Sequence, residues 1–194
     1  MLVSHPHFPA PVRYSVTALS SVPDVQVEQT IALMQHYALE DAASPLLHAA
    51  VLQARQARPN ADVISAIYWW VKDRLRFVLD EVTAAALPAH IAGDVVETLV
   101  RPADLLQSTG AGDCDDYSML LASMLTAAGV RCAFVTVAAD PEARDRYSHV
   151  YVAAFAPDRI ALDASHGVGP GWETPNRFGK RRTWPLNTAD ERFL

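Results

Sequence analysis

Residues 110–129 read GAGDCDDYSMLLASMLTAAG, so two glycines and an aspartate lead directly into Cys114. After the cysteine, leucines and methionines recur at helical spacing until Gly129, which predicts one buried helix that begins at the cysteine. Unpaired backbone N–H groups and the positive end of the helix dipole gather at such an N-terminus, so the thiolate form of Cys114 is favoured there. The pattern therefore predicts a nucleophile held on a rigid core helix.

Composition excludes several classes of protein. The chain has 194 residues, of which 51% are hydrophobic and 20% are charged, which is typical of one soluble globular domain and not of a disordered chain. The formal charge of −6 argues against nucleic-acid binding, because neutralising phosphates needs a surplus of Lys and Arg. No apolar run approaches the roughly 20 residues of a membrane span, and residues 1–7 lack the layout of a secretory signal. We therefore expect neither nucleic acid nor membrane as a partner, and an intracellular location.

The two cysteines have different surroundings. Cys132 lies in a strongly apolar run, which is typical of a buried, unreactive thiol, whereas aspartates flank Cys114 on both sides. We find no cofactor motif. A metal site formed by Cys114, His149 and Asp163 is the weaker alternative, because metal-binding proteins more often show closely paired ligands such as Cys-x-x-Cys.

Pattern and composition divide the chain into three parts. We expect residues 1–59 to form an N-terminal arm and helices, 60–170 a core, and 171–194 an extended C-terminal tail rich in glycine and proline. Apolar spacing predicts helices over 24–38, with Asp24 as the cap, over 45–57 and over 60–75.

Three strand-like runs follow the cysteine helix, at 130–137, 148–155 and 159–163, with turn residues between them. They predict an antiparallel meander. In such a meander, His149 near the start of one strand and Asp163 at the end of the next lie side by side. The fold class is therefore α+β, with N-terminal helices followed by a central helix packed on an antiparallel sheet.

Cysteine hydrolysis or acyl transfer needs a thiolate, an imidazole that shares its proton, and a group that orients the imidazole. Cys114, His149 and Asp163 supply these three groups in that order along the chain. The sequence does not identify a second oxyanion donor beside the Cys114 backbone N–H, and Gln107 upstream is expected to be an exposed polar residue.

Three segments resemble the signatures of the transglutaminase-like superfamily: GDCDD at 112–116, SHVYV at 148–152 and ALDAS at 161–165. The helix over 64–77 also resembles the helix that precedes the papain-like core of that superfamily, and the likeness covers about residues 60–170. The resemblance implies a Cys-His-Asp triad. In it Cys114 is the nucleophile, His149 the general base and acid, and Asp163 the orienting carboxylate.

The resemblance also implies a reaction and a setting. The reaction is acyl transfer on amide bonds of a peptide or protein through a thioester, either as peptide or isopeptide hydrolysis or as transglutamination. The Gly-Asp-Cys-Asp-Asp form is similar to versions encoded by tailed phages and prophages, which implies phage structural proteins as partners and a bacterial cytoplasm or a virion as location. The alternative is a non-enzymatic phage virion or assembly protein on the same fold.

Some residues near the site depart from the family or have a purely structural interpretation. Animal transglutaminases carry an aromatic residue beside the nucleophile and calcium-binding domains, whereas aspartates flank Cys114 here, so hydrolysis is at least as well supported as crosslinking. Asp115 and Asp116 suit the first turn of a helix as partners of its dipole. His166 lies in a glycine-rich turn and is expected at the surface, with the wall of a pocket as the alternative. The basic patch of Arg177, Lys180, Arg181 and Arg182 is expected to contact the acidic surface of the chain or a partner.

Overall fold

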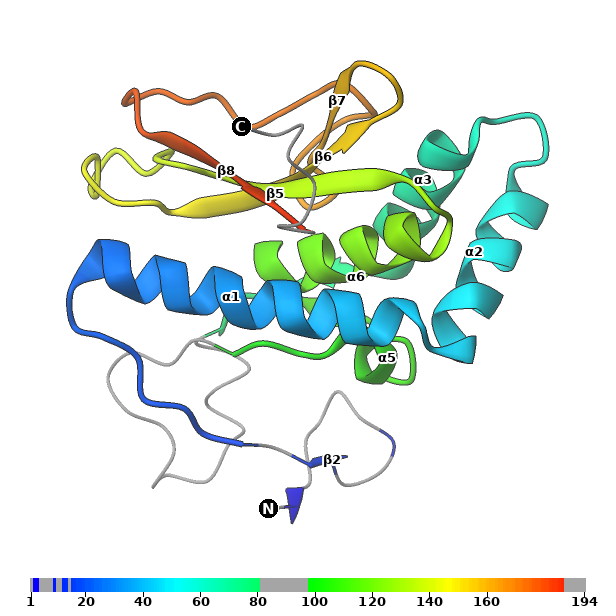
Figure 1. Ribbon diagram of the computed structural model, residues 1–194, viewed down its shortest axis with the longest axis horizontal. Coiled ribbons are helices and arrows are strands. Elements are labelled where there is room, and N and C mark those ends of the chain that lie inside the picture. Colours follow the sequence, from blue (N-terminus) through cyan, green and yellow to red (C-terminus); the bar gives the residue numbers. More distant parts are fainter. Residues whose placement is uncertain (1, 4–8, 10–11, 14, 81–97, 187–194) are drawn as a thin grey trace.

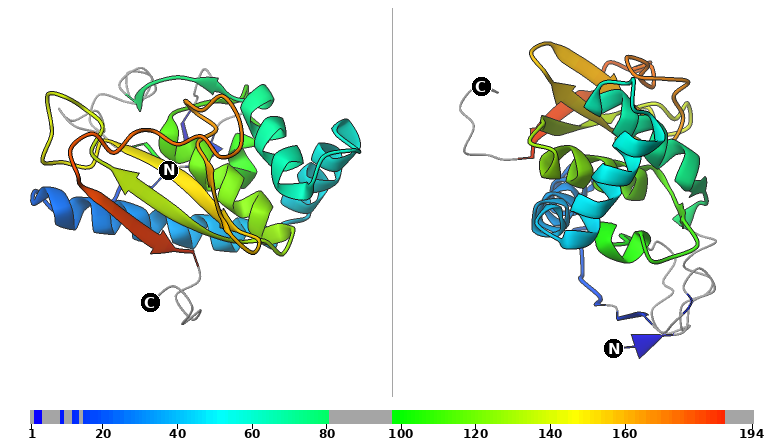
Figure 2. Two further views of the ribbon diagram at one scale, coloured as in Figure 1. Left: turned by 90° about the horizontal axis from the view of Figure 1, so that it is seen from above. Right: turned by 90° about the vertical axis from the view of Figure 1, so that its right-hand side faces the viewer.

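The computed structural model describes residues 2–3, 9, 12–13, 15–80 and 98–186. In this part of the chain the largest sheet has four antiparallel strands in the order β7-β6-β5-β8. One face of the sheet packs on helix α6, and α1 lies on the other side of that helix (Figures 1 and 2). The strands are β5 (Arg131–Val137), β6 (His149–Phe155), β7 (Arg159–Leu162) and β8 (Arg181–Pro185).

Helix α6 (Cys114–Ala127) is the centre of the molecule. Eleven of its 14 residues are buried, because the sheet covers one side and helices cover the others, as expected for a helix that is apolar all round. Gly129 follows the helix with φ +74°, a left-handed conformation that glycine adopts without a Cβ penalty. The expected core helix that begins at Cys114 and ends before Gly129 is therefore confirmed.

Four further helices surround α6 in the described residues: α1 (Pro23–Ala42), α2 (Pro45–Ala57), α3 (Val63–Arg74) and the short α5 (Pro102–Leu105). The prediction that Asp24 caps the first of these helices was wrong. Val22 is the N-cap of α1 and makes no side-chain capping bond, because Pro23 occupies the first turn, where its fixed φ suits the helix and its missing N–H is no loss. The predicted helix from residue 60 begins at Val63, where the Asp62 carboxylate accepts from the Ser65 N–H at 3.0 Å.

The meander of β5, β6 and β7 is confirmed, but the segment after it differs from expectation. Residues 181–185, placed by sequence alone in an extended tail over 171–194, form the edge strand β8 and pair with β5. Three cations of the basic patch are neutralised within the chain: Lys180 by Asp24 at 2.6 Å, Arg182 by Glu28 at 2.5 Å and Arg181 by Glu173 at 2.8 Å. Residues 187–194 lie outside the described part, and the other domain boundaries stay a prediction.

The outer face of the sheet is covered by the segment that follows β7 (Figure 1). Buried apolar side chains of β5, β6 and β7 form a second, smaller cluster on this face. Tyr151 in this cluster donates its hydroxyl to Glu173 at 2.6 Å, and Arg159 contacts the same carboxylate at 2.6 Å. These bonds anchor the segment after β7 to the sheet, and that segment carries several residues of the candidate site.

Two small strand pairs complete the described structure. β3 (Arg76–Phe77) runs parallel to β4 (Ala111–Gly112), and β1 (Leu2–Val3) runs antiparallel to β2 (Val12–Arg13). The β3–β4 pair joins the end of α3 to the loop before Cys114. Among the residues described, none of the helices combines the length and apolar character needed to cross a bilayer.

Candidate active site

Cys114 is the first residue of α6, and its position is set by the loop before it. Asp113 caps the helix, because its carboxylate accepts from the Asp115 N–H at 3.2 Å. Gly112 lies so close to Asp116 that an added Cβ would be 2.5 Å from Oδ2 of that carboxylate. A glycine is therefore required at 112 for the chain to enter the helix in this way. Cys114 is half-buried, whereas Cys132 is buried, and these two residues are not joined by a disulfide.

The aspartates after Cys114 are not an exposed acidic flank. Asp115 and Asp116 are 3% and 2% exposed. Asp116 accepts from the Val100 N–H at 2.8 Å. Burial, together with the nearby charge of Asp113, raises the pKa of Asp116 well above its ordinary value. Burial therefore disfavours the charged form of Asp116, and the acidic residues after Cys114 are not two freely solvated carboxylates.

His149 and Asp163 are in direct contact, as the meander predicted. Nε2 of His149, the first residue of β6, lies 2.8 Å from Oδ2 of Asp163, just after β7. Both side chains are buried. An ionised carboxylate can only accept, so His149 donates through Nε2. The other ring nitrogen, Nδ1, is therefore the one left to exchange a proton with a thiol or a leaving group.

Asp163 is held by a dense set of donors. Oδ2 accepts from His149, from the Thr174 hydroxyl at 2.7 Å and from the Thr174 N–H at 3.3 Å. Oδ1 accepts from the Ser165 hydroxyl at 3.0 Å and the His166 N–H at 3.1 Å. Burial by itself would raise the pKa of Asp163, but the bonds from His149, Thr174 and His166 outweigh it and lower the pKa to about 2. Asp163 is therefore a permanently ionised partner of His149 at neutral pH.

The hydrogen bonds of Asp163 also help to decide whether these residues form a metal site. The sequence alternative joined Cys114 to His149 and Asp163, but the structure groups His149 and Asp163 with His166 instead, and each of these three places one potential ligand atom within 4.8 Å of the others. However, the carboxylate of Asp163 already accepts from five donors and is 0% exposed. A cation would have to displace several of these bonds, so the arrangement suits an orienting carboxylate better than a metal ligand.

Ser118 connects the helix that begins at Cys114 with the strand that begins at His149. Its hydroxyl lies 2.6 Å from the carbonyl oxygen of Cys114, one turn earlier in α6, and 3.2 Å from that of Val150, the residue after His149. The first turn of α6 and the first residues of β6 are therefore side by side. The structure thus brings Cys114, His149 and Asp163 to one end of α6.

Thr174 and Phe77 belong to the site but were not found from the sequence, and His166, expected at the surface, borders the site as well. His166 is exposed, as expected, yet its ring meets the His149 ring edge to face at 4.7 Å between centroids and 86° between planes. On another side its ring contacts Phe77 at 5.1 Å. The sequence offered one signal that His166 lies near the site: it follows Asp163, a residue type that favours turns, by three positions. Nothing local in the sequence marks Thr174 or Phe77.

Gln107 is an exposed polar residue in the turn that follows α5. Its side-chain amide donates to the Ala103 carbonyl at 3.1 Å, four residues earlier. This bond directs the amide toward the preceding helical turn, and the side chain is exposed, as expected for Gln107.

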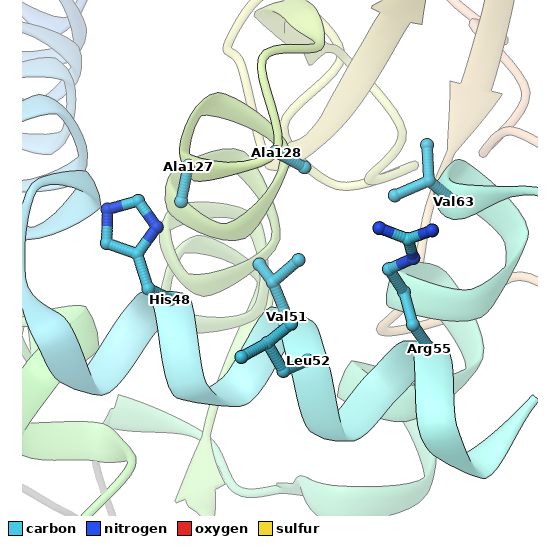
Figure 3. Close-up of a pocket in the computed structure, with 7 residues that line it drawn as sticks. All are labelled: His48, Val51, Leu52, Arg55, Val63, Ala127 and Ala128. Atoms are coloured by element: carbon cyan, nitrogen blue, oxygen red, sulfur yellow. The ribbon is translucent and has the colours of Figure 1, made fainter.

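A groove of about 340 Å³ lies elsewhere, between α2, α3 and the C-terminal end of α6 (Figure 3). At 1.5 Å per residue, that end of α6 is about 20 Å from Cys114. The groove is therefore separate from the candidate active site. Its lining residues are His48, Val51, Leu52, Arg55, Val63, Ala127 and Ala128.

A model of the transglutaminase-like superfamily core matches residues 49–160. The chain belongs to the transglutaminase-like superfamily. The region matched includes Cys114 and His149 and ends three residues before Asp163. This membership and the observed α+β architecture confirm the expected fold class, a core helix on an antiparallel sheet with N-terminal helices. Comparison with curated proteins finds no match.

Solved structures similar to this transglutaminase-like chain include a candidate cysteine protease from Cytophaga hutchinsonii. That similarity has a TM-score of 0.42 and 15% identity, over 85% of this chain and 56% of the other. A second is Rad4–Rad23 bound to a 6-4 photoproduct lesion, with a TM-score of 0.43 and 12% identity, over 72% of this chain and 37% of the other. The chain thus spans less than two thirds of either relative, and similarity at this level carries no argument about activity.

Proposed function

We propose that this chain is a cysteine-dependent acyl-transfer enzyme that acts on amide bonds of a peptide or protein. The observation that carries the proposal is the buried 2.8 Å contact between His149 and Asp163, next to the helix N-terminus that presents Cys114. Membership of the transglutaminase-like superfamily supports the same chemistry. We assign Cys114 as nucleophile, His149 as general base and acid, and Asp163 as orienting carboxylate.

The proposed reaction has two steps, formation of a thioester and its cleavage, and His149 gives a proton in the first step and takes one back in the second. The Cys114 thiolate attacks the amide carbonyl, and the Cys114 backbone N–H at the start of α6 is directed to stabilise the oxyanion. The C–N bond breaks, the leaving amine takes a proton from His149, and a thioester remains on Cys114. Water or a second amine then attacks the thioester and transfers a proton to His149, and the thiolate leaves. Asp163 stays ionised throughout and stabilises the imidazolium form of His149.

The acceptor in the second step distinguishes hydrolysis from transglutamination. Both remain within the proposal, and peptide or isopeptide hydrolysis is at least as well supported, because aspartates rather than an aromatic residue flank Cys114. The phage setting, with phage structural proteins as partners and a bacterial cytoplasm or virion as location, stays a prediction. So does the alternative of a non-enzymatic assembly protein, because the comparisons support only the superfamily.

The test is the pH dependence of Cys114 alkylation by iodoacetamide. Cys132 is a built-in reference, because burial raises the pKa of its thiol to about 12, so it should react slowly in the folded protein. We expect Cys114 to react much faster, with an ionisation below about pH 7.5, and to lose this advantage in His149→Ala. The Cys114→Ser variant shows which of the two cysteines carries the fast-reacting label, because that label is lost if it was on Cys114. If Cys114 reacts like an ordinary thiol, whose pKa is about 8.5, the proposal fails.

A positive labelling result leads directly to a substrate assay. Peptides and isopeptide-linked model substrates are incubated with the wild type and with Cys114→Ser, and the products are analysed by mass spectrometry with and without an added primary amine. Free acid products indicate hydrolysis, and amine adducts indicate transfer. A protein with a reactive Cys114 but no product from either class would point to the non-enzymatic alternative.

A further inference from the structure

The His166 ring lies between two other rings of the site. It meets His149 edge to face at 4.7 Å and Phe77 at 5.1 Å and 71°. Its backbone N–H also donates to Oδ1 of Asp163 at 3.1 Å. His166 therefore contacts both members of the His149–Asp163 pair, one through its ring and the other through its backbone.

The hydrogen bonds of Ser165 determine which nitrogen of His166 carries a proton. The Ser165 hydroxyl has one hydrogen, which it donates to Oδ1 of Asp163 at 3.0 Å, since an ionised carboxylate can only accept. The same oxygen lies 3.0 Å from Nδ1 of His166. It must therefore accept from Nδ1–H. His166 is thus held as the Nδ1–H tautomer in a continuous chain through Ser165 and Asp163 to His149.

The charges around His166 favour its neutral form. Partial burial lowers the pKa of His166, and the positive charge of His149 lowers it further, while the negative charge of Asp163 opposes this. Lys72 of α3, which donates to the Ala164 carbonyl at 3.2 Å, lowers it again. Phe77 of β3 adds no charge. Two adjacent imidazolium rings would repel each other, so His149 and His166 are not both charged without a penalty.

We propose that His166 is a positioning residue for the acyl-transfer reaction, holding the His149 ring while neutral and suppressing the thiolate–imidazolium pair when it becomes protonated. The proposal rests on the function proposed above, because the imidazolium of His149 matters only if Cys114 is the nucleophile. It assigns two separate roles to His166. The ring and its Nδ1–H fix geometry, and its titration sets the acid limit of Cys114 reactivity.

His166→Phe tests the charge while keeping a flat ring between His149 and Phe77. The same substitution at His48, which lines the groove at the far end of α6 (Figure 3), is the matched control. Alkylation of Cys114 is followed from neutral to acid pH, with each variant scaled to its own rate at neutral pH. At the acid end we expect His166→Phe to keep about tenfold more of its rate than the wild type, because the repulsion between two adjacent imidazolium rings is removed. The His48→Phe profile should match the wild type.

Two outcomes of this experiment separate the proposals. If Cys114 is highly reactive and His166→Phe has the same pH profile as the wild type, the role of His166 is overturned and the proposed function stands. If Cys114 in the wild type reacts as an ordinary thiol, the proposed function itself fails and the role of His166 fails with it.

Nitrogen NMR of the imidazole groups tests the geometry without a substitution at His166. In the wild type we expect neutral His166 as the Nδ1–H tautomer, and we expect Ser165→Ala to lose this preference because the hydroxyl acceptor is gone. An Nε2–H tautomer in the wild type would overturn the proposed chain of hydrogen bonds. This measurement remains decisive even if His166→Phe fails to fold.

Discussion

Replacing Asp163 by asparagine should destabilise the protein in a pH-dependent way. The carboxylate is 0% exposed, and its pKa is lowered from 3.8 to about 2 in the folded protein. A difference of nearly two pKa units at 1.36 kcal/mol each corresponds to about 2 kcal/mol of stability from the charged form. Because the folded pKa is the lower one, this stability is present above about pH 4 and is lost as the pH falls toward 2.

Urea unfolding of the wild type and Asp163→Asn at several pH values measures this contribution. We expect the difference in unfolding free energy between the two proteins to have reached its full value by about pH 5 and to have lost about half of the 2 kcal/mol by pH 3. The m-values should agree, so that the comparison concerns stability alone. Asp158→Asn, which changes an exposed carboxylate in the turn between β6 and β7, is the matched control.

The pH dependence, not the size of the loss at neutral pH, is the decisive quantity. Asparagine in a buried site has its own penalties for unmatched donors and acceptors, and these are independent of pH over this range. If the difference between wild type and Asp163→Asn is the same at pH 5 and pH 3, the Asp163 carboxylate is not held ionised by its neighbours. The assignment of Asp163 as a permanently charged partner of His149 would then be wrong.

Three further substitutions, one of them with a matched control, test other parts of the site and of the fold around it. Gly112→Ala should cost about 1–3 kcal/mol in thermal unfolding and slow Cys114 alkylation, because the new Cβ would meet Asp116 at 2.5 Å. Gly169→Ala, whose Cβ would meet its nearest atom at 3.6 Å, should change neither, and equal effects of the two would refute the steric argument. Cys132→Ala should leave Cys114 alkylation unchanged, and a large drop would show that the two thiols are coupled. Asp41→Ala should lower the unfolding free energy by about 2 kcal/mol, because the carboxylate is 5% exposed and accepts from charged and backbone donors; a change within about 0.5 kcal/mol in chemical denaturation would contradict this.

The sequence by itself determined the central helix and the meander that follows it. Leucines and methionines at helical spacing after Cys114, with Gly129 as the end, specify α6 through local periodicity alone. Turn residues between three apolar runs specify β5, β6 and β7, and antiparallel pairing then brings His149 to Asp163. Local signals were sufficient here because each element buries a continuous apolar face.

Only the tertiary structure decided the strand β8 and the surroundings of Cys114, His149 and Asp163. Residues 181–185 carry charged and half-exposed side chains, and they form a strand because the edge of β5 offers backbone partners, which no local pattern reveals. Thr174 and His166 reach Asp163 and His149 through loops without periodicity. The burial that raises the pKa of Asp116 likewise depends on packing around it. Long-range packing and desolvation, which depend on the whole fold, therefore set the electrostatics around Cys114, His149 and Asp163, the three residues that the sequence had already indicated.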